Sequence, residues 1–185
     1  MIGGKKFARE IVRKPNAAAF LVYDPIRDAI VLVLQVREPM RSKKNRKGVT
    51  VEVPAGHVKG KNTRAEIARE ASEEIGATIP EEQVLLLNQG QMLAVSPGWT
   101  TERVALATIE LKPGQIDRAR EKFGLAKEGE YITRRFVPVS DLETMVLEDL
   151  KTYALVQWFL KERAKKRIHE LQEDLHAMHR MDDRS

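Results

Sequence analysis

The chain has 185 residues, of which 42% are hydrophobic and 32% charged, a composition typical of a folded globular protein and not of a disordered one. The absence of cysteine excludes disulfides, zinc–thiolate sites and a cysteine nucleophile. No apolar run approaches the roughly 18 residues of a membrane-spanning helix, and the first ten residues lack the apolar core of a secretory signal. We therefore expect a cytoplasmic protein with no membrane partner.

The net charge of +5 is concentrated near the N-terminus. Residues 1–48 hold twelve Lys and Arg against four Asp and Glu, and five of those basic residues fall within 41–47. Such a run attracts phosphates or nucleic acid, or it is a solvated loop between two strands. Because no aromatic residue is interleaved with it, we do not expect nucleic acid as a partner.

The first predicted elements are strands. Residues 17–23 and 30–36 are short apolar runs joined by a turn that contains Pro25, and residues 49–53 form a third run that ends in Pro-Ala-Gly. Thr63, with Glu66 three residues later, then predicts the start of a helix. That helix is expected to continue to about Ile75, where Gly76 ends it.

Further strands are predicted at 84–87, 104–111 and 131–139, with a short helix at 116–123. From about Asp149 to Met181 the pattern is helical, with no Gly or Pro. Strands first, one helix among them and a long helix last predict an α+β fold. Because no linker or internal repeat is visible, residues 1–185 are expected to form a single domain.

The helix predicted at 63–75 carries a cluster of carboxylates. At about 100° per residue its apolar side chains gather on one face, and the opposite face carries Glu66, Glu70, Glu73 and Glu74. Like charges at this spacing repel each other, and a divalent cation between them would reverse that penalty. Carboxylate oxygens suit Mg²⁺ or Mn²⁺. The alternative is an ordinary acidic surface.

The stretch Gly56–Ala77 resembles the signature sequence of the Nudix hydrolases, Gly-x5-Glu-x7-Arg-Glu-U-x-Glu-Glu-x-Gly-U, where U is an apolar residue. Residues 69–77 match the second half of that pattern at every position. The first half departs from it, because Gly56 lies one residue too close to Arg69 and Lys61 stands in place of the first Glu. We hypothesise that Glu66 partly replaces that missing carboxylate.

Three more stretches are similar to the ADP-ribose pyrophosphatases of this family: VLVLQVR at 31–37, SPGWTTER at 96–103 and GLAKEGEYI at 124–132. The resemblance covers residues 17–140. It implies an α/β/α sandwich around a mixed sheet. It also implies Mg²⁺-dependent hydrolysis, with Mn²⁺ as a possible substitute, of the diphosphate bond of ADP-ribose or a related nucleoside diphosphate sugar.

The resemblance also assigns residues to roles. The expected metal ligands are Glu70, Glu73, Glu74 and the backbone carbonyl of Ala55. The expected catalytic residues are Glu74, Arg69, which could orient Glu73, and Glu128 or Glu130, which would deprotonate or orient the attacking water. The expected substrate-binding residues are Arg37, Ser96, Gly98 and Glu102. For Arg37 a salt bridge at the rim is the alternative, and residues 96–102 could be an ordinary turn.

The C-terminal helix lies outside the resemblance. Ile168, Leu171, Leu175 and Met178 follow the 3-4-3 spacing of helix–helix packing. Since the resemblance also implies a homodimer, we expect this half of the helix to pack on a second subunit, while its first half covers the sheet.

Two other functions compete with the expected hydrolase. A nucleotide-sugar-binding regulator that has lost catalysis would account for Lys61 and the shortened spacing. A nucleic-acid or RNA-cap hydrolase would use the basic 41–47 run, but the 96–103 stretch disfavours it.

Overall fold

The computed structural model describes residues 8, 10–125, 127 and 129–182. Within them the strands are β1 (Ala17–Asp24), β2 (Ala29–Val36), β3 (Val49–Glu52), β4 (Ala55–His57), β5 (Leu85–Leu86), β6 (Leu93–Ala94), β7 (Arg103–Glu110), β8 (Lys122–Phe123) and β9 (Ile132–Pro138). The α-helices are α1 (Thr63–Ile75) and α2 (Leu150–Asp182), and short 3-10 turns lie at Glu38–Met40, Glu81–Gln83, Asn88–Gly90 and Val139–Asp141.

The strands form one mixed sheet with the order β5-β7-β1-β2-β9-β8. β3 pairs with β2, β4 with β1, and β6 with β7. β1 and β7 run parallel, whereas the other pairs are antiparallel. The central strand β1 changes partner along its length, from β4 at Ala17–Ala19 to β2 at Val22–Asp24. This change of partner places β4 beside the start of β1.

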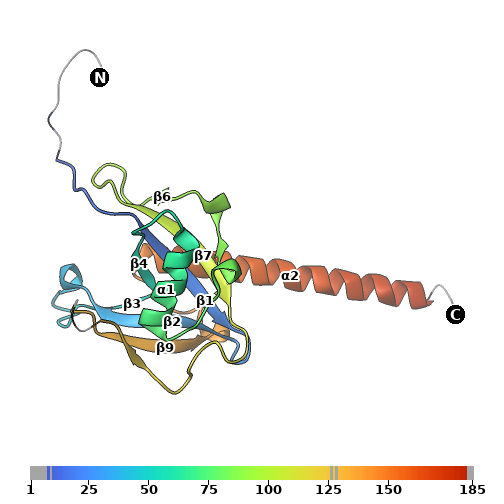
Figure 1. Ribbon diagram of the computed structural model, residues 1–185. Helices are drawn as coiled ribbons and strands as arrows, with labels where there is room; N and C mark the ends of the chain where they lie inside the picture. The colour runs from blue at the N-terminus through green and yellow to red at the C-terminus, as the bar shows by residue number, and fades with distance from the viewer. Residues whose placement is uncertain (1–7, 9, 126, 128, 183–185) are drawn as a thin grey trace, which may run out of the picture.

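Helices cover both faces of the sheet, as Figure 1 shows. On one face, α1 buries Ile67 and Ile75 against Phe20 and its neighbours. On the other, the first half of α2 buries Leu155 against Leu21 and its neighbours. β1 and β2 read as unbroken apolar runs because both of their faces are covered. The α+β class and the three-layer sandwich predicted from the sequence are confirmed.

The predicted helix at 116–123 is wrong. Ile116 forms an isolated bridge with Ala77, and the segment ends in β8. The carbonyls of Asp117 and Arg120 accept hydrogen bonds from the buried guanidinium of Arg134. A helix over 116–123 would use the carbonyl of Asp117 internally, so its capture by Arg134 favours the irregular backbone.

The long helix α2 leaves the body of the molecule part-way along its length. Its buried side chains, Thr152, Leu155, Val156 and Phe159, all lie in the first ten residues. Beyond them the helix extends away from the sheet (Figure 1). No helix in the described part of the chain is long and apolar enough to cross a membrane.

Candidate active site

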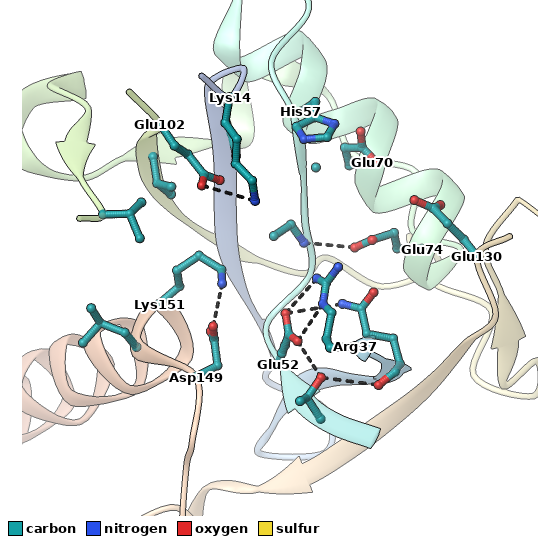
Figure 2. A pocket seen from close by; sticks show the side chains of 18 of the residues that line it. Lys14, Arg37, Glu52, His57, Glu70, Glu74, Glu102, Glu130, Asp149 and Lys151 are labelled. Atoms are coloured by element: carbon teal, nitrogen blue, oxygen red, sulfur yellow. Dashed lines mark hydrogen bonds and ion pairs between the residues drawn. The ribbon is translucent and has the colours of Figure 1, made fainter. Parts of the chain in front are cut away.

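A cleft of about 480 Å³ opens beside the carboxylate face of α1, and its walls also include β3, β4 and the start of α2. Its acidic lining residues are Glu52, Glu70, Glu73, Glu74, Glu102, Glu130, Glu148 and Asp149, and its basic ones are Lys14, Arg37, Lys59, Arg69 and Lys151. Figure 2 shows Glu70, Glu74 and Glu130 on one side, Lys14 and Lys151 on the other, and Arg37 between them.

Helix α1 is fixed at both ends. The side chain of Asn62 caps its N-terminus by accepting a hydrogen bond from the amide of Ala65, so the expected cap at Thr63 is wrong by one residue. Gly76 ends the helix in the left-handed conformation, with φ of 65°. Because Ile67 and Ile75 are anchored in the core, the glutamates of the opposite face are held toward the cleft.

Glu70 packs directly against the backbone of β4. A Cβ atom on Gly56 would lie 2.0 Å from the carboxylate carbon of Glu70, so any side chain at this position would displace that carboxylate. Burial raises the pKa of Glu70, the charges of Glu73 and Glu130 raise it further, and Arg69 opposes them. The positive charge near the Glu70 carboxylate is therefore too small to offset its burial and the neighbouring acids.

Glu74 is a buried acid of the cleft, with 4% of its surface exposed. Its Oε2 accepts a hydrogen bond of 3.0 Å from the amide of Ala55. Burial raises its pKa to about 8, and the charges of Glu70 and Glu130 add to that effect, whereas the Ala55 amide and Arg37 oppose it. An acid in this environment marks a candidate functional site.

Arg69 holds three carboxylates of the same helix. It donates to Glu66 at 3.2 Å, to Glu73 at 2.6 Å and also to Glu70. The contact with Glu73 is the one that its i, i+4 spacing predicts. Glu66 does not line the cleft, so it contacts the site only through Arg69.

Arg37 forms a bidentate ion pair with Glu52, a residue that sequence reasoning missed. Nε and Nη2 of Arg37 each lie 2.9 Å from an oxygen of Glu52, which also accepts a hydrogen bond from Thr50. Burial would raise the pKa of Glu52, but Arg37 and Thr50 outweigh burial and hold it below the usual value. The salt-bridge alternative for Arg37 is therefore realised, and 43% of the arginine side chain stays exposed beside the cleft.

The start of α2 also reaches the cleft, which the sequence did not indicate. Asp149 accepts hydrogen bonds from the amide and hydroxyl of Thr152 and lies 2.5 Å from Lys151. The same hydroxyl accepts a hydrogen bond from the amide of Val53. On another wall, Lys14 lies 3.8 Å from Glu102. The Asp149-x-x-Thr152 cap was the available signal for a fixed helix start, but no local signal placed it beside Val53.

The predicted site residues separate into three groups. Eight line the cleft together: Arg37, Ala55, Arg69, Glu70, Glu73, Glu74, Glu102 and Glu130. Ser96 and Gly98 do not line the cleft. The carbonyl of Ser96 instead accepts hydrogen bonds from the amides of Trp99 and Thr100 in a turn. Glu128 lies outside the described residues.

The donor atoms at this end of the cleft fit a hard divalent cation. Glu70 and Glu74 supply carboxylates beside the backbone of Ala55, and the raised pKa values of both acids indicate a deficit of positive charge. Among the described side chains, no three acids or histidines already surround one point closely enough to enclose an ion. Backbone oxygens and water would therefore have to complete the coordination shell.

Comparison with known proteins agrees with this geometry. Residues 12–159 match the model of the NUDIX domain family. The chain belongs to the Nudix family. It is 31% identical over 154 residues to a GDP-mannose pyrophosphatase from Yersinia pestis, an alignment that covers 81% of this chain and 73% of the relative.

Two further relatives of the Nudix protein are ADP-ribose pyrophosphatases. The one from Haemophilus influenzae is 36% identical over 129 residues, and the one from Escherichia coli is 31% identical over 127 residues. Each alignment covers 67% of this chain but only 55% or 56% of the relative. The predicted family is confirmed, and the chain is a Nudix diphosphatase.

Proposed function

We propose that this enzyme hydrolyses the diphosphate bond of ADP-ribose or a related nucleoside diphosphate sugar, with Mg²⁺ as its cofactor and Mn²⁺ as a substitute. The products would be a nucleoside monophosphate and a sugar phosphate. The observation that carries the proposal is the arrangement of the cleft, in which Glu70, Glu74 and Glu130 face Arg37, Lys14 and Lys151. With a divalent cation held by the acids, a diphosphate between these walls would meet positive charge on both sides.

The divalent cation would be held by Glu70, Glu73, Glu74 and the carbonyl of Ala55. When bound, such an ion neutralises the diphosphate and lowers the pKa of a coordinated water. Glu73 is at present paired with Arg69, which keeps its carboxylate beside Glu70. The role of Arg69 is thus to orient the acids rather than to contact substrate.

Glu130 is the described candidate for general base. It lies on the loop between β8 and β9, which is tied to α1 by a hydrogen bond from the amide of Gly124 to the carbonyl of Glu73. In the proposed step a water oxygen bonds to one phosphorus, the bridging P–O bond breaks, and Glu130 accepts the water proton. Glu128 remains an alternative for the same role.

The distal part of the substrate is expected to meet Arg37, Glu102 and the 96–102 turn. Arg37 already uses Nε and Nη2 on Glu52, so its remaining edge would contact a phosphate. Ser96 and Gly98 stay part of the proposal, although they lie outside the cleft lining. We also propose that the protein is a cytoplasmic homodimer.

The test is phosphate release, coupled to a phosphatase, from ADP-ribose, GDP-mannose, UDP-glucose, NADH and diadenosine polyphosphates, with and without Mg²⁺. Turnover that requires Mg²⁺ and is lost in Glu74→Gln supports the proposal. Lys59→Ala, at the rim of the same cleft, serves as a matched control expected to retain most of the turnover. Metal-independent turnover, or full activity in Glu74→Gln, would refute it.

Lys61, which stands in place of the first Glu of the signature sequence, is the reason to test one alternative function. Lys61 is exposed and does not line the cleft, so the position gives no carboxylate to the site. Tight binding of a nucleotide sugar in calorimetry without turnover of any substrate would identify a regulator that has lost catalysis. Loss of turnover in Glu66→Ala would show that Glu66 compensates for Lys61 through Arg69.

A further inference from the structure

The loop between β2 and β3 carries a concentration of positive charge that the proposed reaction does not use. Residues 41–47 contain five basic side chains and no acidic one. Arg41 is paired with Glu38 at 2.5 Å and also donates to the carbonyl of Arg46 at 2.7 Å. The other four basic side chains, which we call the loop cations, are exposed and form no ion pair with any acid that the structure describes: Lys43, Lys44, Arg46 and Lys47.

The loop that presents these cations is held by its own hydrogen bonds. The side chain of Asn45 accepts from the amide of Val49 at 3.1 Å and donates to the carbonyl of Val49 at 2.8 Å. The hydroxyl of Ser42 accepts from the amide of Asn45 at 3.0 Å. Gly48 then adopts a φ of 64°, a conformation that glycine reaches without strain. The loop cations are therefore held together on one folded turn.

The base of this loop forms part of the cleft wall. The amide of Arg37 donates to the carbonyl of Gly48 at 2.8 Å, and this hydrogen bond closes the loop. Arg37, Pro39 and Met40 line the cleft, whereas residues 41–47 do not. Each loop cation is within four residues of Met40 or Gly48 in the chain, so its backbone lies at most about 14 Å from one of them. The loop, light blue beside β3 in Figure 1, therefore stands at the rim of the cleft.

The cleft needs an external source of positive charge if it is to attract an anion. Its lining includes eight acidic and five basic side chains, an excess of three negative charges when all are ionised. A single divalent cation would not balance this excess, and the diphosphate of a nucleotide is itself negative. The loop cations add four positive charges at the rim, outside the cleft lining.

We propose that the loop cations form an electrostatic rim that draws phosphorylated nucleotides to the cleft and favours those with more phosphate groups. This inference rests on the proposed function, because it takes a nucleotide as the ligand of the cleft. Exposed charges act over about 10 Å at an ionic strength of about 0.1 M. Charges of one sign at a cleft raise the rate at which an oppositely charged ligand arrives by about 10-fold or more.

Attraction of this kind has a characteristic kinetic effect. It acts while the substrate approaches and leaves the bond-breaking step unchanged, so it raises kcat/KM without raising kcat. The attraction weakens as salt shortens the range of the charges, and it grows with the charge of the ligand. Residues that only support the fold would show neither dependence.

A nucleic acid is the other polyanion that basic loops attract. Two observations favour a small nucleotide instead. Residues 41–47 contain no aromatic side chain on which a base could stack. The loop also borders a cleft whose lining carries more acids than bases, and such a lining would repel a long phosphate backbone.

The test compares two variants that each lose four positive charges. The rim variant replaces the loop cations: Lys43→Gln, Lys44→Gln, Arg46→Gln and Lys47→Gln. Ser42 and Asn45 are kept, so the hydrogen bonds that their side chains make remain. The control variant replaces four exposed cations that do not line the cleft and form no ion pair with a described acid: Lys112→Gln, Arg135→Gln, Lys161→Gln and Lys166→Gln.

The steady-state constants for ADP-ribose are measured at fixed Mg²⁺ from about 0.03 M to about 1 M salt, over which the screening length falls several-fold. At low salt, kcat/KM of the rim variant should lie about 10-fold below that of the parent, with kcat unchanged. At high salt the two proteins should agree, and the control should follow the parent throughout. Equal kcat/KM at low salt, a loss that persists at high salt or is shared by the control, or a fall in kcat would overturn the proposal.

The preference for more phosphate groups is tested by binding. Dissociation constants of AMP, ADP and ATP are measured by calorimetry at low salt and without divalent cations, so that each added phosphate adds negative charge. The loss of affinity from the parent to the rim variant should increase from AMP to ADP to ATP. Equal losses for the three nucleotides, or no binding to the parent, would refute the preference.

The same buffer tests the nucleic-acid alternative with a 5′-phosphorylated RNA oligonucleotide. RNA that binds the parent more tightly than ATP does, and loses this binding in the rim variant, would identify nucleic acid as the partner and overturn the proposal. The binding series needs no turnover, so the two proposals can fail separately. A parent without turnover that shows the expected nucleotide series would refute the proposed function alone, whereas equal kcat/KM in an active parent and rim variant would refute the rim alone.

Discussion

At the scale of single residues, the site depends on positions that carry no chemistry of their own. Gly56 has no side chain, yet the carboxylate of Glu70 occupies the space where a Cβ would lie. Glu52 is 3% exposed and contacts the cleft beside Arg37. These residues fix the direction in which the functional groups point.

Gly56→Ala is expected to reduce turnover and metal affinity by about 10–100-fold, the range found when the surroundings of metal ligands are changed. The added methyl group would displace the Glu70 carboxylate. Turnover as a function of Mg²⁺ concentration measures the effect. Gly60→Ala is the control, because its Cβ would meet the nearest atom, Oε1 of Glu66, at 3.5 Å. Equal behaviour of the two variants would contradict the steric argument.

Arg37→Met is expected to lower the free energy of unfolding by about 1–3 kcal/mol, because it leaves the buried carboxylate of Glu52 unpaired. Adding Glu52→Leu should restore most of that stability, since no buried charge then remains. Urea unfolding measures the stability of the single and the double variant. Turnover should stay low in both variants, because both lack Arg37. Arg41→Met, which breaks an exposed pair with Glu38, should not change stability measurably. A double variant no more stable than the single one would refute the explanation.

At the scale of elements, the sequence predicted the structure that neighbouring residues determine. It missed the structure that depends on contacts between residues distant in sequence. Helix α1 was predictable because the spacing of Ile67 and Ile75 and the stop at Gly76 are local signals. The region 116–123 was not, because Arg134 of β9, distant in sequence, captures its carbonyls.

β3 shows the same limit in a strand. Its alternation suggests that Val49 and Val51 face the interior, yet Thr50 and Glu52 are its buried residues. The carboxylate side of the cleft was predictable from one helix. On the opposite side, Lys14, Glu52 and Lys151 were not predictable, because they come from separate elements that only the fold brings together.

The N-terminus of α2 depends on one hydroxyl. Thr152 accepts from Val53 and donates to Asp149, and it is fully buried. Thr152→Val should lower the free energy of unfolding by about 1–3 kcal/mol, because the Val53 amide loses its partner. Thr144→Val, at an exposed threonine that donates to Asp141, should change it by less than about 0.5 kcal/mol. Thermal unfolding of the two variants provides the comparison, and equal stability would refute the assignment.

At the scale of the whole molecule, global stability should depend on pH through Asp24, which is fully buried at the end of β1. Burial would raise the pKa of Asp24, but Arg118 and the amide of Ile26 outweigh burial and lower it. A lowered pKa means that the folded state favours the ionised form. Its contribution is therefore complete above the unfolded-state pKa near 4 and is lost as the pH falls through the lower folded-state value.

Asp24→Asn should accordingly cost about 1–3 kcal/mol at pH 7. The difference from the parent should shrink as the pH falls below about 4, where the carboxylate of the unfolded parent becomes protonated, and on through the lower folded-state pKa. Urea unfolding between pH 7 and pH 2.5 gives this curve. A difference that stays constant over the whole range would show that the ion pair with Arg118 is not its cause.

In the function that we propose, the acids Glu70, Glu73 and Glu74 of α1 serve the chemistry, whereas other segments select the substrate. The cleft wall opposite these acids comes from β3, from the loops after β2 and β6, and from the first turn of α2. Those segments can change in evolution or by engineering while α1 and β4 stay as they are. The fold is therefore a suitable starting point for redirecting the hydrolysis toward other diphosphates by altering those segments alone.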